Sequence, residues 1–342
     1  MKKNILFKVN ASAQTGFGHF RRSMSLAQIL KEEDHTLHLQ TNSDNPLLAN
    51  IPTQTFLTTD LLPDELGGAL DWKLLKGQIQ AHAIDWIVLD GYEYTESYEK
   101  WIADEKIKLL RIDDYPRYQY WADVLLCQNF GARDFVFETH KPCFKALGLN
   151  YFLVPQELRS LVKADRFQPS KLMKITISLG GATEYTKLLT PIFSAFLKTL
   201  DPQKFKVSFI VTDPDDHAQV AQTLKGFVAV EILAFQKHLG AALNESDFVF
   251  TTPGTTMWEL VYLMVPFAVI PLNEAQGEYC KTLHADGVCY VLPSFPHLKE
   301  KNLANFFHQT ISDERALSLL KAKYQSLMSR DLLITNLKSL IY

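Results

Sequence analysis

The segment Thr15-Gly16-Phe17-Gly18-His19-Phe20-Arg21-Arg22 lies between a short apolar run, Ile5–Val9, and a segment with helical spacing of apolar residues, Ser23–Leu30. This order predicts a strand, a glycine-rich turn and a helix. Two glycines in such a turn allow positive φ angles and a close approach of the backbone to a ligand. The helix start favours an anion, and an imidazole at His19 is a base near neutral pH. A plain glycine turn with a surface histidine is the alternative for this segment alone.

The alternation of short apolar runs and helical segments continues along the whole chain. Strands are predicted at Ile5–Val9, Thr36–Thr41, Trp86–Leu89, Lys108–Ile112, Val124–Cys127, Lys174–Leu179, Lys206–Val211, Val228–Ile232 and Phe248–Thr251. Helices are predicted at Ser23–Leu30, Tyr98–Glu105, Leu188–Leu200 and Ala218–Leu224. Because the strands are short and continuously apolar, they indicate parallel sheets that helices cover on both faces. We therefore expect an α/β protein with two doubly wound parallel-sheet domains.

A polar and basic segment around Pro169 separates the two halves and has the composition of a linker. We expect an N-terminal domain at 1–158, a linker at 159–173, a C-terminal domain at 174–312 and a helical tail at 313–342. Ligands of doubly wound sheets bind beyond the carboxyl ends of the strands. The predicted site is therefore a cleft between the two domains.

The composition is that of a water-soluble protein. The chain has 342 residues, 47% of them hydrophobic, and a formal net charge of −3, which leaves no basic excess for nucleic-acid binding. Its four cysteines, Cys127, Cys143, Cys280 and Cys289, show no C-x-x-C spacing and indicate reduced thiols. No apolar run is long enough to span a membrane. We expect a cytoplasmic protein, a monomer or weak oligomer, without nucleic-acid partners.

Two further glycine turns follow predicted strands in the second half. Gly180-Gly181 ends the strand at Lys174–Leu179, and Gly254-Thr255-Thr256 follows the strand at Phe248–Thr251. Backbone N–H groups and hydroxyls at a helix start suit a phosphate. Glu259, about one turn later, is placed to accept hydrogen bonds from ribose hydroxyls, although an ordinary first-turn glutamate is the alternative.

Together, the three turns favour a nucleotide or nucleotide-sugar ligand. The chain has neither the G-x-G-x-x-G pattern of dinucleotide redox enzymes nor the lysine signature of a phosphate-binding loop for ATP hydrolysis.

These motifs resemble those of the UDP-2,4-diacetamido-2,4,6-trideoxy-β-L-altropyranose hydrolases of bacterial pseudaminic acid synthesis. The resemblance runs from Asn10-Ala11-Ser12 and Thr15–Arg22 to Gly287 and covers most of the chain. Its other matching positions are Leu26-Ala27, Asp90-Gly91-Tyr92, Asp113-Asp114, Ala122-Asp123, Gln128-Asn129, Leu147-Gly148, Tyr151, Gly180-Gly181, Gly254 to Glu259, Pro266 and Gln276. That family has the GT-B architecture, so the resemblance implies the same fold here.

The resemblance also implies roles for individual residues. His19 matches the histidine that activates the attacking water. The implied sugar-binding residues are Asn10, Gly16, Gly18, Arg22, Asp90 and Tyr92. The implied nucleotide-binding residues are Gly180, Gly181, Gly254, Thr255, Thr256, Glu259 and Gln276. The family needs no metal and no other cofactor, and its small-molecule ligand is a UDP-sugar.

The chain departs from the family pattern at four positions. Asn10 replaces an aspartate, Gly91 a histidine, Pro155 an arginine and Ala275 an asparagine. Losing an arginine removes a charge-assisted contact to substrate. Arg159, one helical turn further on, is a candidate to replace it. These departures concern the sugar more than the nucleotide.

Three functions are consistent with these observations. The first is hydrolysis of a UDP-activated amino sugar with His19 as the base. The second is a GT-B glycosyltransferase in which an acceptor hydroxyl takes the place of water. The third is a binding or scaffold protein on a decayed enzyme fold, against which the retention of His19 and its flanking glycines argues.

Overall fold

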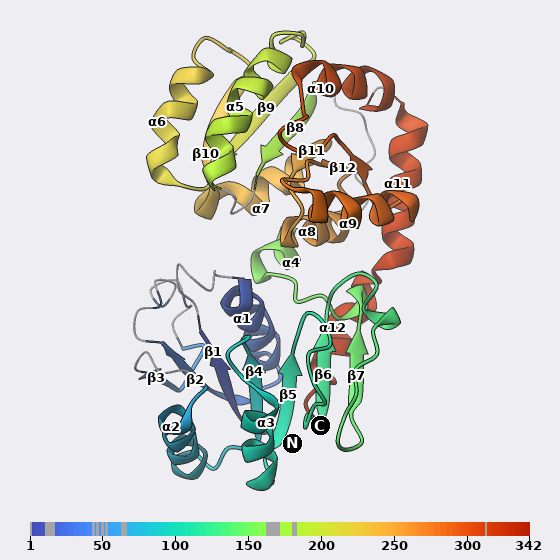
Figure 1. Ribbon diagram of the computed structural model, residues 1–342. Coiled ribbons are helices and arrows are strands. Elements are labelled where there is room, and N and C mark those ends of the chain that lie inside the picture. Colours follow the sequence, from blue (N-terminus) through green and yellow to red (C-terminus); the bar gives the residue numbers. More distant parts are fainter. Residues whose placement is uncertain are drawn as a thin grey trace. The chain divides into compact units, whose positions relative to one another are not determined.

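Two parallel β-sheets organise the chain, one in each of two units (Figure 1). Unit 1 comprises Met1–Gln156 and Ser329–Tyr342, and unit 2 comprises Glu157–Met328. The computed structural model describes residues 2–10, 18–42, 45, 48, 51, 54–62, 67–161, 172–179, 183–311 and 313–342.

The described part of unit 1 contains a seven-stranded sheet in the order β3-β2-β1-β4-β5-β6-β7. Its strands are β1 (Asn4–Val9), β2 (Thr36–Asn42), β3 (Thr58–Leu62), β4 (Trp86–Asp90), β5 (Lys108–Ile112), β6 (Val124–Cys127) and β7 (Phe144–Leu147). Its helices are α1 (Gly18–Lys31), α2 (Ala69–Ala81), α3 (Glu96–Asp104) and α12 (Arg330–Lys338). All neighbouring strands are parallel, and the strand order changes direction between β1 and β4.

The sequence of unit 1 explains this arrangement. All five residues of β4 are buried, as expected for a central parallel strand covered on both faces. Helix α1 buries Phe20, Ser23, Leu26, Ala27 and Leu30, whose spacing of three to four residues forms one stripe on the helix. Lys31 in its last turn complements the negative end of the helix dipole.

Unit 2 has a six-stranded parallel sheet within the described residues, in the order β10-β9-β8-β11-β12-β13. Its strands are β8 (Met173–Ser178), β9 (Phe205–Val211), β10 (Val230–Ala234), β11 (Phe248–Thr251), β12 (Phe267–Val269) and β13 (Tyr290–Val291). Its helices are α4 (Gln156–Leu161), α5 (Thr183–Leu197), α6 (Pro214–Thr223), α7 (Phe235–Glu245), α8 (Thr255–Leu263), α9 (Glu274–Ala285), α10 (Glu300–Phe306) and α11 (Glu314–Leu327). Here the direction changes between β8 and β11.

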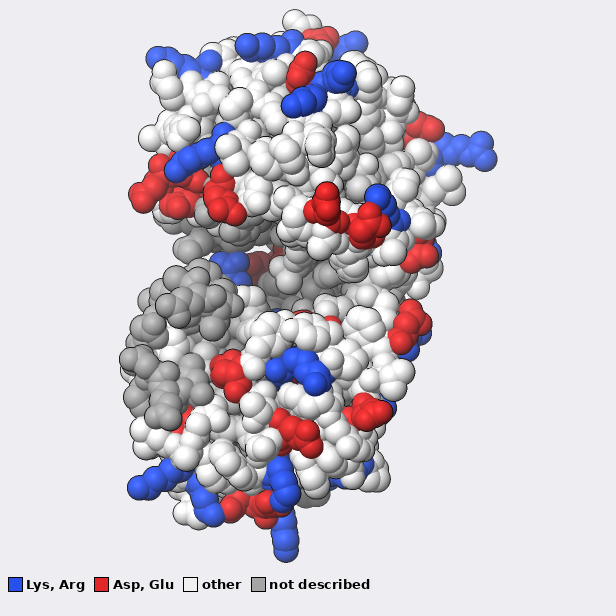
Figure 2. Space-filling model, viewed as in Figure 1, with Lys and Arg blue, Asp and Glu red and all other residues white. Residues whose placement is uncertain are grey.

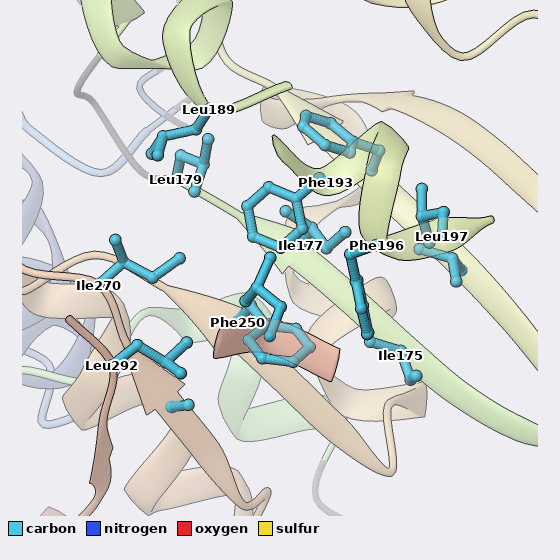
Figure 3. Close-up of a cluster of buried hydrophobic side chains, with 14 of the residues drawn as sticks. Ile175, Ile177, Leu179, Leu189, Phe193, Phe196, Leu197, Phe250, Ile270 and Leu292 are labelled. Carbon is cyan, nitrogen blue, oxygen red and sulfur yellow. The ribbon is translucent and has the colours of Figure 1, made fainter. Parts of the chain in front are cut away.

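An aromatic cluster fills the core of unit 2 (Figure 3). Phe193 and Phe196 of α5 pack edge-on against Phe250 of β11, with ring centroids 5.8 and 5.9 Å apart. Ile175 and Ile177 of β8 complete this layer, and all five side chains are at most 1% exposed. Burying each such side chain contributes about 1.5–3 kcal/mol, so this cluster anchors the helix that follows β8 on the sheet that carries the predicted nucleotide turns.

The two sheets confirm the predicted α/β class with two doubly wound sheets. Residues 313–342, the predicted helical tail, form two helices, α11 in unit 2 and α12 in unit 1. Helix α12 packs on unit 1, where Leu333 and Leu337 are buried and Lys338 pairs with Glu33 at 2.7 Å.

The acidic residues from Asp213 to Asp216 form the start of helix α6. The Asp213 carboxylate caps this helix by accepting from the N–H of Asp215.

Charged side chains of both signs are interspersed on the face shown in Figure 2. Among the described helices, none is long and apolar enough to cross a membrane.

Candidate active site

The carboxyl ends of four adjacent strands bring polar residues together at one edge of the unit 1 sheet. Asp90 ends β4, and its register partners are Val9 of β1 and Ile112 of β5. Asn10, Asp113-Asp114 and Asn129 follow the ends of β1, β5 and β6. This edge includes the point where the strand order changes direction, which is where open α/β sheets bind ligands.

His19, Tyr92 and Asp114 form the centre of this group. His19 Nε2 lies 3.8 Å from Asp114 Oδ2, and the His19 ring meets the Tyr92 ring edge-on at 4.6 Å. The Tyr92 hydroxyl donates a hydrogen bond of 2.5 Å to the same Oδ2. The tyrosine is 45% exposed and the histidine side chain 15% exposed, so both are accessible to solvent.

Arg22 connects this centre to the sheet beneath it. Because His19 and Arg22 are three residues apart in α1, they lie on the same side of the helix. Arg22 donates two hydrogen bonds, of 2.8 and 2.6 Å, to the two oxygens of Asp90, and a third of 2.6 Å to Asp114. Ser23 Oγ donates to Asp90 as well, at 3.0 Å. Asp90 is fully buried, so its carboxylate holds Arg22 in place and is not presented at the surface.

These contacts fix the charge state of the group. Burial alone would raise the pKa of Asp114, but the charge and hydrogen bonds of Arg22 and the bond from Tyr92 outweigh it and hold that pKa below its usual value. Burial and the neighbouring carboxylate raise the pKa of Tyr92 well above its usual value. At neutral pH the site therefore presents a charged Asp114 that accepts from a protonated phenol.

Asp113 has a different role from its neighbour. Its Oδ2 accepts from Arg117 Nε at 3.0 Å and from Tyr120 at 3.1 Å, while Oδ1 accepts from the N–H of Asp114 at 2.9 Å. The Arg117 guanidinium also lies 5.3 Å from the centre of the Tyr92 ring and donates to the Tyr92 carbonyl at 3.1 Å. Asp113 thus holds the loop that positions Tyr92 and Asp114.

A second polar group lies beside the first, at the ends of β1 and β4. Asn10 Nδ2 donates to Glu93 Oε1 at 2.5 Å and to the Tyr94 hydroxyl at 2.9 Å. In the adjoining part of β1, the ammonium of Lys8 donates to Asp71 at 2.5 Å and to Gln40 at 2.8 Å. Lys8 and Asp71 are essentially inaccessible to solvent.

Burial lowers the pKa of Lys8 to about 8, in opposition to Asp71, which raises it. Between pH 8 and the usual pKa of 10.5, the unfolded chain therefore binds a proton that the folded chain does not. Stability from this group rises with pH across that window. We expect the unfolding free energy of the wild type, minus that of Lys8→Met, to increase from pH 8 to pH 10.5 in urea titrations. A difference that stays flat or falls would contradict the burial of an ammonium in β1.

In unit 2, the predicted residues from Gly254 to Glu259 follow β11 at the carboxyl edge of the sheet. Gly254 precedes α8, Thr255 is exposed in its first turn and Thr256 is buried. Glu259 lies one turn further on and is half-buried. The Thr252 hydroxyl donates to the Leu179 carbonyl at 3.0 Å and so joins the ends of β11 and β8. Such a helix start presents free N–H groups to an anion.

Gln276 is engaged in a helix cap. The Asn273 side chain accepts from the Gln276 N–H at 2.9 Å, and Gln276 Oε1 accepts from the Leu272 N–H at 2.8 Å. These reciprocal bonds stabilise the start of α9. The neighbouring Ala275 is exposed.

Three predicted positions, Gly16, Gly180 and Gly181, lie outside the described residues. Gly18 is the first residue of α1, with open space where a Cβ would stand. Pro155 belongs to unit 1 and Arg159 to unit 2. Among the residues that the structure describes, no group of three or more His, Cys, Asp or Glu side chains is placed to hold a metal ion.

Asp113-Asp114 follows the predicted strand at Lys108–Ile112, and the sequence predicts for it a helper role in positioning ligand or loop. Glu93, Arg117 and Asn129 were not predicted as parts of this edge. Asn129 Nδ2 donates to the Asp114 carbonyl at 2.9 Å. Each of these three residues lies two to five positions after the end of a strand, and that placement is the signal that could have identified them.

No protein-family model matches the chain. The UDP-2,4-diacetamido-2,4,6-trideoxy-β-L-altropyranose hydrolase of Campylobacter jejuni is 24% identical over 271 residues, which cover 78% of this chain and 90% of that protein. An uncharacterized protein of Methanocaldococcus jannaschii is 22% identical over 286 residues, or 80% of this chain, and the match spans 57% of that protein's length.

Solved structures resemble the chain over nearly its whole length. Acinetobacter baumannii MurG matches with a TM-score of 0.68 at 14% identity, over 99% of both chains. The spinosyn rhamnosyltransferase SpnG matches at 0.66 and 13% identity over the whole of both chains. S. aureus MnaA, in a structure with UDP, matches at 0.61 and 12% identity over 97% of this chain and 94% of that one. The chain therefore has a GT-B-like fold, and a UDP-sugar hydrolase is among its distant relatives.

Proposed function

We propose that this protein is an enzyme that hydrolyses a UDP-activated amino sugar of the kind used for bacterial surface glycans, releasing UDP and the free sugar. The group formed by His19, Tyr92 and Asp114 carries the proposal, because it combines an accessible base with a charged carboxylate held in place. The distant relative from Campylobacter jejuni, which is named as a UDP-sugar hydrolase, supports the reaction class.

In the proposed reaction, His19 takes a proton from water while the water oxygen attacks the anomeric carbon of the sugar. A new C–O bond forms, the bond from that carbon to the UDP oxygen breaks, and UDP leaves with the electron pair. Asp114 stabilises the imidazolium that results, as a carboxylate does beside a catalytic histidine. Base assistance of this kind contributes about 100- to 10,000-fold in rate.

The proposal assigns the nucleotide to unit 2. The start of α8, with Gly254, Thr255 and Thr256, offers N–H groups and hydroxyls to the diphosphate, and Glu259 is assigned to the ribose. Gly180 and Gly181 belong to this assignment as sequence predictions. Fixed dipoles at a helix start favour the charge that develops on a leaving phosphate. A solved structure of the same fold, MnaA, contains UDP.

A glycosyltransferase reaction is the second candidate. It would use the same base and leaving group, with an acceptor hydroxyl in the place of water. Tyr92 and Tyr115 favour it, because they are 45% and 48% exposed and their rings lie 5.8 Å apart beside His19. Such an aromatic surface could receive an acceptor.

The test is to incubate the purified protein with a panel of UDP-sugars and to measure UDP release with and without added acceptor alcohols or lipid-linked sugars. We expect release in water alone, with free sugar as the product. Release that requires an acceptor and yields a glycoside would replace hydrolysis with transfer. No release from any UDP-sugar under either condition would contradict both reactions.

Glu259→Ala tests the assignment of the nucleotide to unit 2. We expect UDP to bind more weakly by about 1.5–3 kcal/mol, the range for hydrogen bonds to a charged group. Calorimetry with UDP alone measures this effect. Glu278→Ala is the control, because Glu278 is an exposed glutamate on α9 that pairs with Lys281. Equal UDP affinity in the wild type and a folded Glu259→Ala would remove Glu259 from the site.

A further inference from the structure

Glu93 is placed by a glycine two residues before it. Gly91 has φ +149°, a backbone region that side chains rarely adopt, and a Cβ built there would lie 2.7 Å from the carboxylate carbon of Glu93. Any larger residue at position 91 would therefore displace the Glu93 carboxylate. The missing side chain leaves room for Glu93 to fold back over the end of β4 and to reach Asn10 at the end of β1.

Among the described residues, two acceptor atoms of this pair receive no hydrogen bond. Glu93 Oε1 accepts from Asn10, whereas Oε2 accepts no hydrogen bond from any described residue. Asn10 is 4% exposed, and its Oδ1 has no hydrogen-bond partner in the described part of the chain. The orientation of the amide follows from its neighbour, since a carboxylate accepts and only the Nδ2 of asparagine donates. A buried polar atom without a partner costs free energy that a ligand can recover.

The charge of the pair is also unbalanced. No described lysine, arginine or histidine forms an ion pair with Glu93, and the nearby ammonium of Lys8 already bonds to Asp71 and Gln40. A half-buried carboxylate of this kind favours a ligand group that donates hydrogen bonds or carries positive charge. It disfavours a carbonyl, which also accepts, and a carboxylate, which repels it.

We propose that Glu93 and Asn10 form a sugar-recognition subsite that selects an unsubstituted amine or hydroxyl and discriminates against an acylated amine or a carboxylate at the same position. The proposal rests on the proposed function, because it concerns the sugar of the same UDP-sugar. It also connects two departures from the family pattern, since Asn10 donates a hydrogen bond to Glu93 and Gly91 leaves room for the Glu93 carboxylate.

The test compares binding of matched UDP-sugars that differ in one substituent. One pair is UDP-glucosamine and UDP-N-acetylglucosamine, with UDP-glucose as the hydroxyl form at the same carbon. The other pair is the 4-amino and 4-acetamido forms of UDP-2-acetamido-2,4,6-trideoxyglucose. We expect the wild type to bind the free amine or hydroxyl at least about tenfold more tightly at one of these carbons, as the strength of a charged hydrogen bond implies.

Glu93→Gln should abolish or reverse that preference. The glutamine keeps the shape, can still accept from Asn10, and turns an N–H group toward the ligand, which then favours the carbonyl of an acetamide. Glu96→Gln is the matched control. Glu96 lies three residues after Glu93 and pairs with His140 at the surface, so the substitution removes the same charge outside the proposed subsite. It should retain the wild-type preference.

Calorimetric binding separates this proposal from the proposed reaction. A preference that disappears in Glu93→Gln supports the subsite, whether or not UDP is released. If that preference disappears and the wild type releases no UDP, the proposed hydrolysis is overturned and the subsite is not. Wild-type protein that shows no preference in either pair overturns the subsite, as does a preference that survives in Glu93→Gln. Failure of every UDP-sugar to bind would overturn the subsite together with the nucleotide assignment.

Discussion

His19→Asn is expected to lower kcat for UDP release by about two to four orders of magnitude, the usual loss when a general base is removed. The fold should persist, because His19 lies in the first turn of α1 and is not among the buried residues of that helix. UDP affinity should persist as well, since the proposed nucleotide contacts belong to unit 2. Initial rates at saturating UDP-sugar, with calorimetry for UDP, measure both effects.

His140→Asn is the control for this experiment. His140 also lies beside a carboxylate, Glu96 at 2.7 Å, and against an aromatic ring, Trp121 at 4.3 Å. It stands apart from the His19 group, so its removal should leave kcat within a few-fold of the wild type. A His19→Asn enzyme that retains wild-type kcat would mean that the histidine is structural and that another group, such as Asp114, is the base.

Arg22→Met is expected to destabilise the protein by about 3–5 kcal/mol. The substitution leaves the fully buried carboxylate of Asp90 with only the Ser23 hydroxyl as a partner among the contacts described above. Removing one member of a buried ion pair strands the other charge in a low-dielectric interior, which is far more costly than losing an exposed pair. Urea unfolding followed by tryptophan fluorescence reports mainly on unit 1, which contains four of the five tryptophans.

Lys100→Met is the matched control, because Lys100 pairs with Asp104 on an exposed face of α3, where both side chains are more than half exposed. Surface pairs of this type contribute about 0–1 kcal/mol. Arg22→Lys should fall between the two, since an ammonium keeps the charge but cannot make two parallel bonds to one carboxylate. Equal stability of Arg22→Met and Lys100→Met would contradict the buried network.

Most of the central strands of both sheets could be predicted to within one or two residues at each end. The strands at Lys108–Ile112, Val124–Cys127 and Phe248–Thr251 have the predicted boundaries, because each is a buried apolar run between clear turn signals. Strands β12 and β13, of three and two residues, were not predicted, and neither were the edge strands β3 and β7. In these two edge strands, the exposed positions hold both polar and apolar residues, so no clear pattern marks them in the sequence. They are stabilised by pairing with a neighbouring strand.

Part of the site could also be predicted, because some of its residues lie close together in the sequence. His19 and Arg22 share one helix turn and one motif, so the sequence places them together. The contact of His19 with Asp114, by contrast, joins residues 95 positions apart and depends on β5 lying next to β4. The role of Glu93 depends on the empty space at Gly91, which no spacing rule encodes. Contacts of this kind follow from sheet order, and sheet order is a property of the folded chain.

The C-terminal helix α12 has a consequence for synthesis of the protein on the ribosome. Unit 1 is the first to emerge, yet it needs residues 329–342, whose Asn336 side chain donates to the Asn150 carbonyl at 3.1 Å and whose Leu333 and Leu337 are fully buried. Until unit 2 has been translated, the surface of unit 1 that Leu333 and Leu337 cover therefore stays exposed. A stop codon directly after the codon of Met328 would leave unit 2 complete and unit 1 without α12.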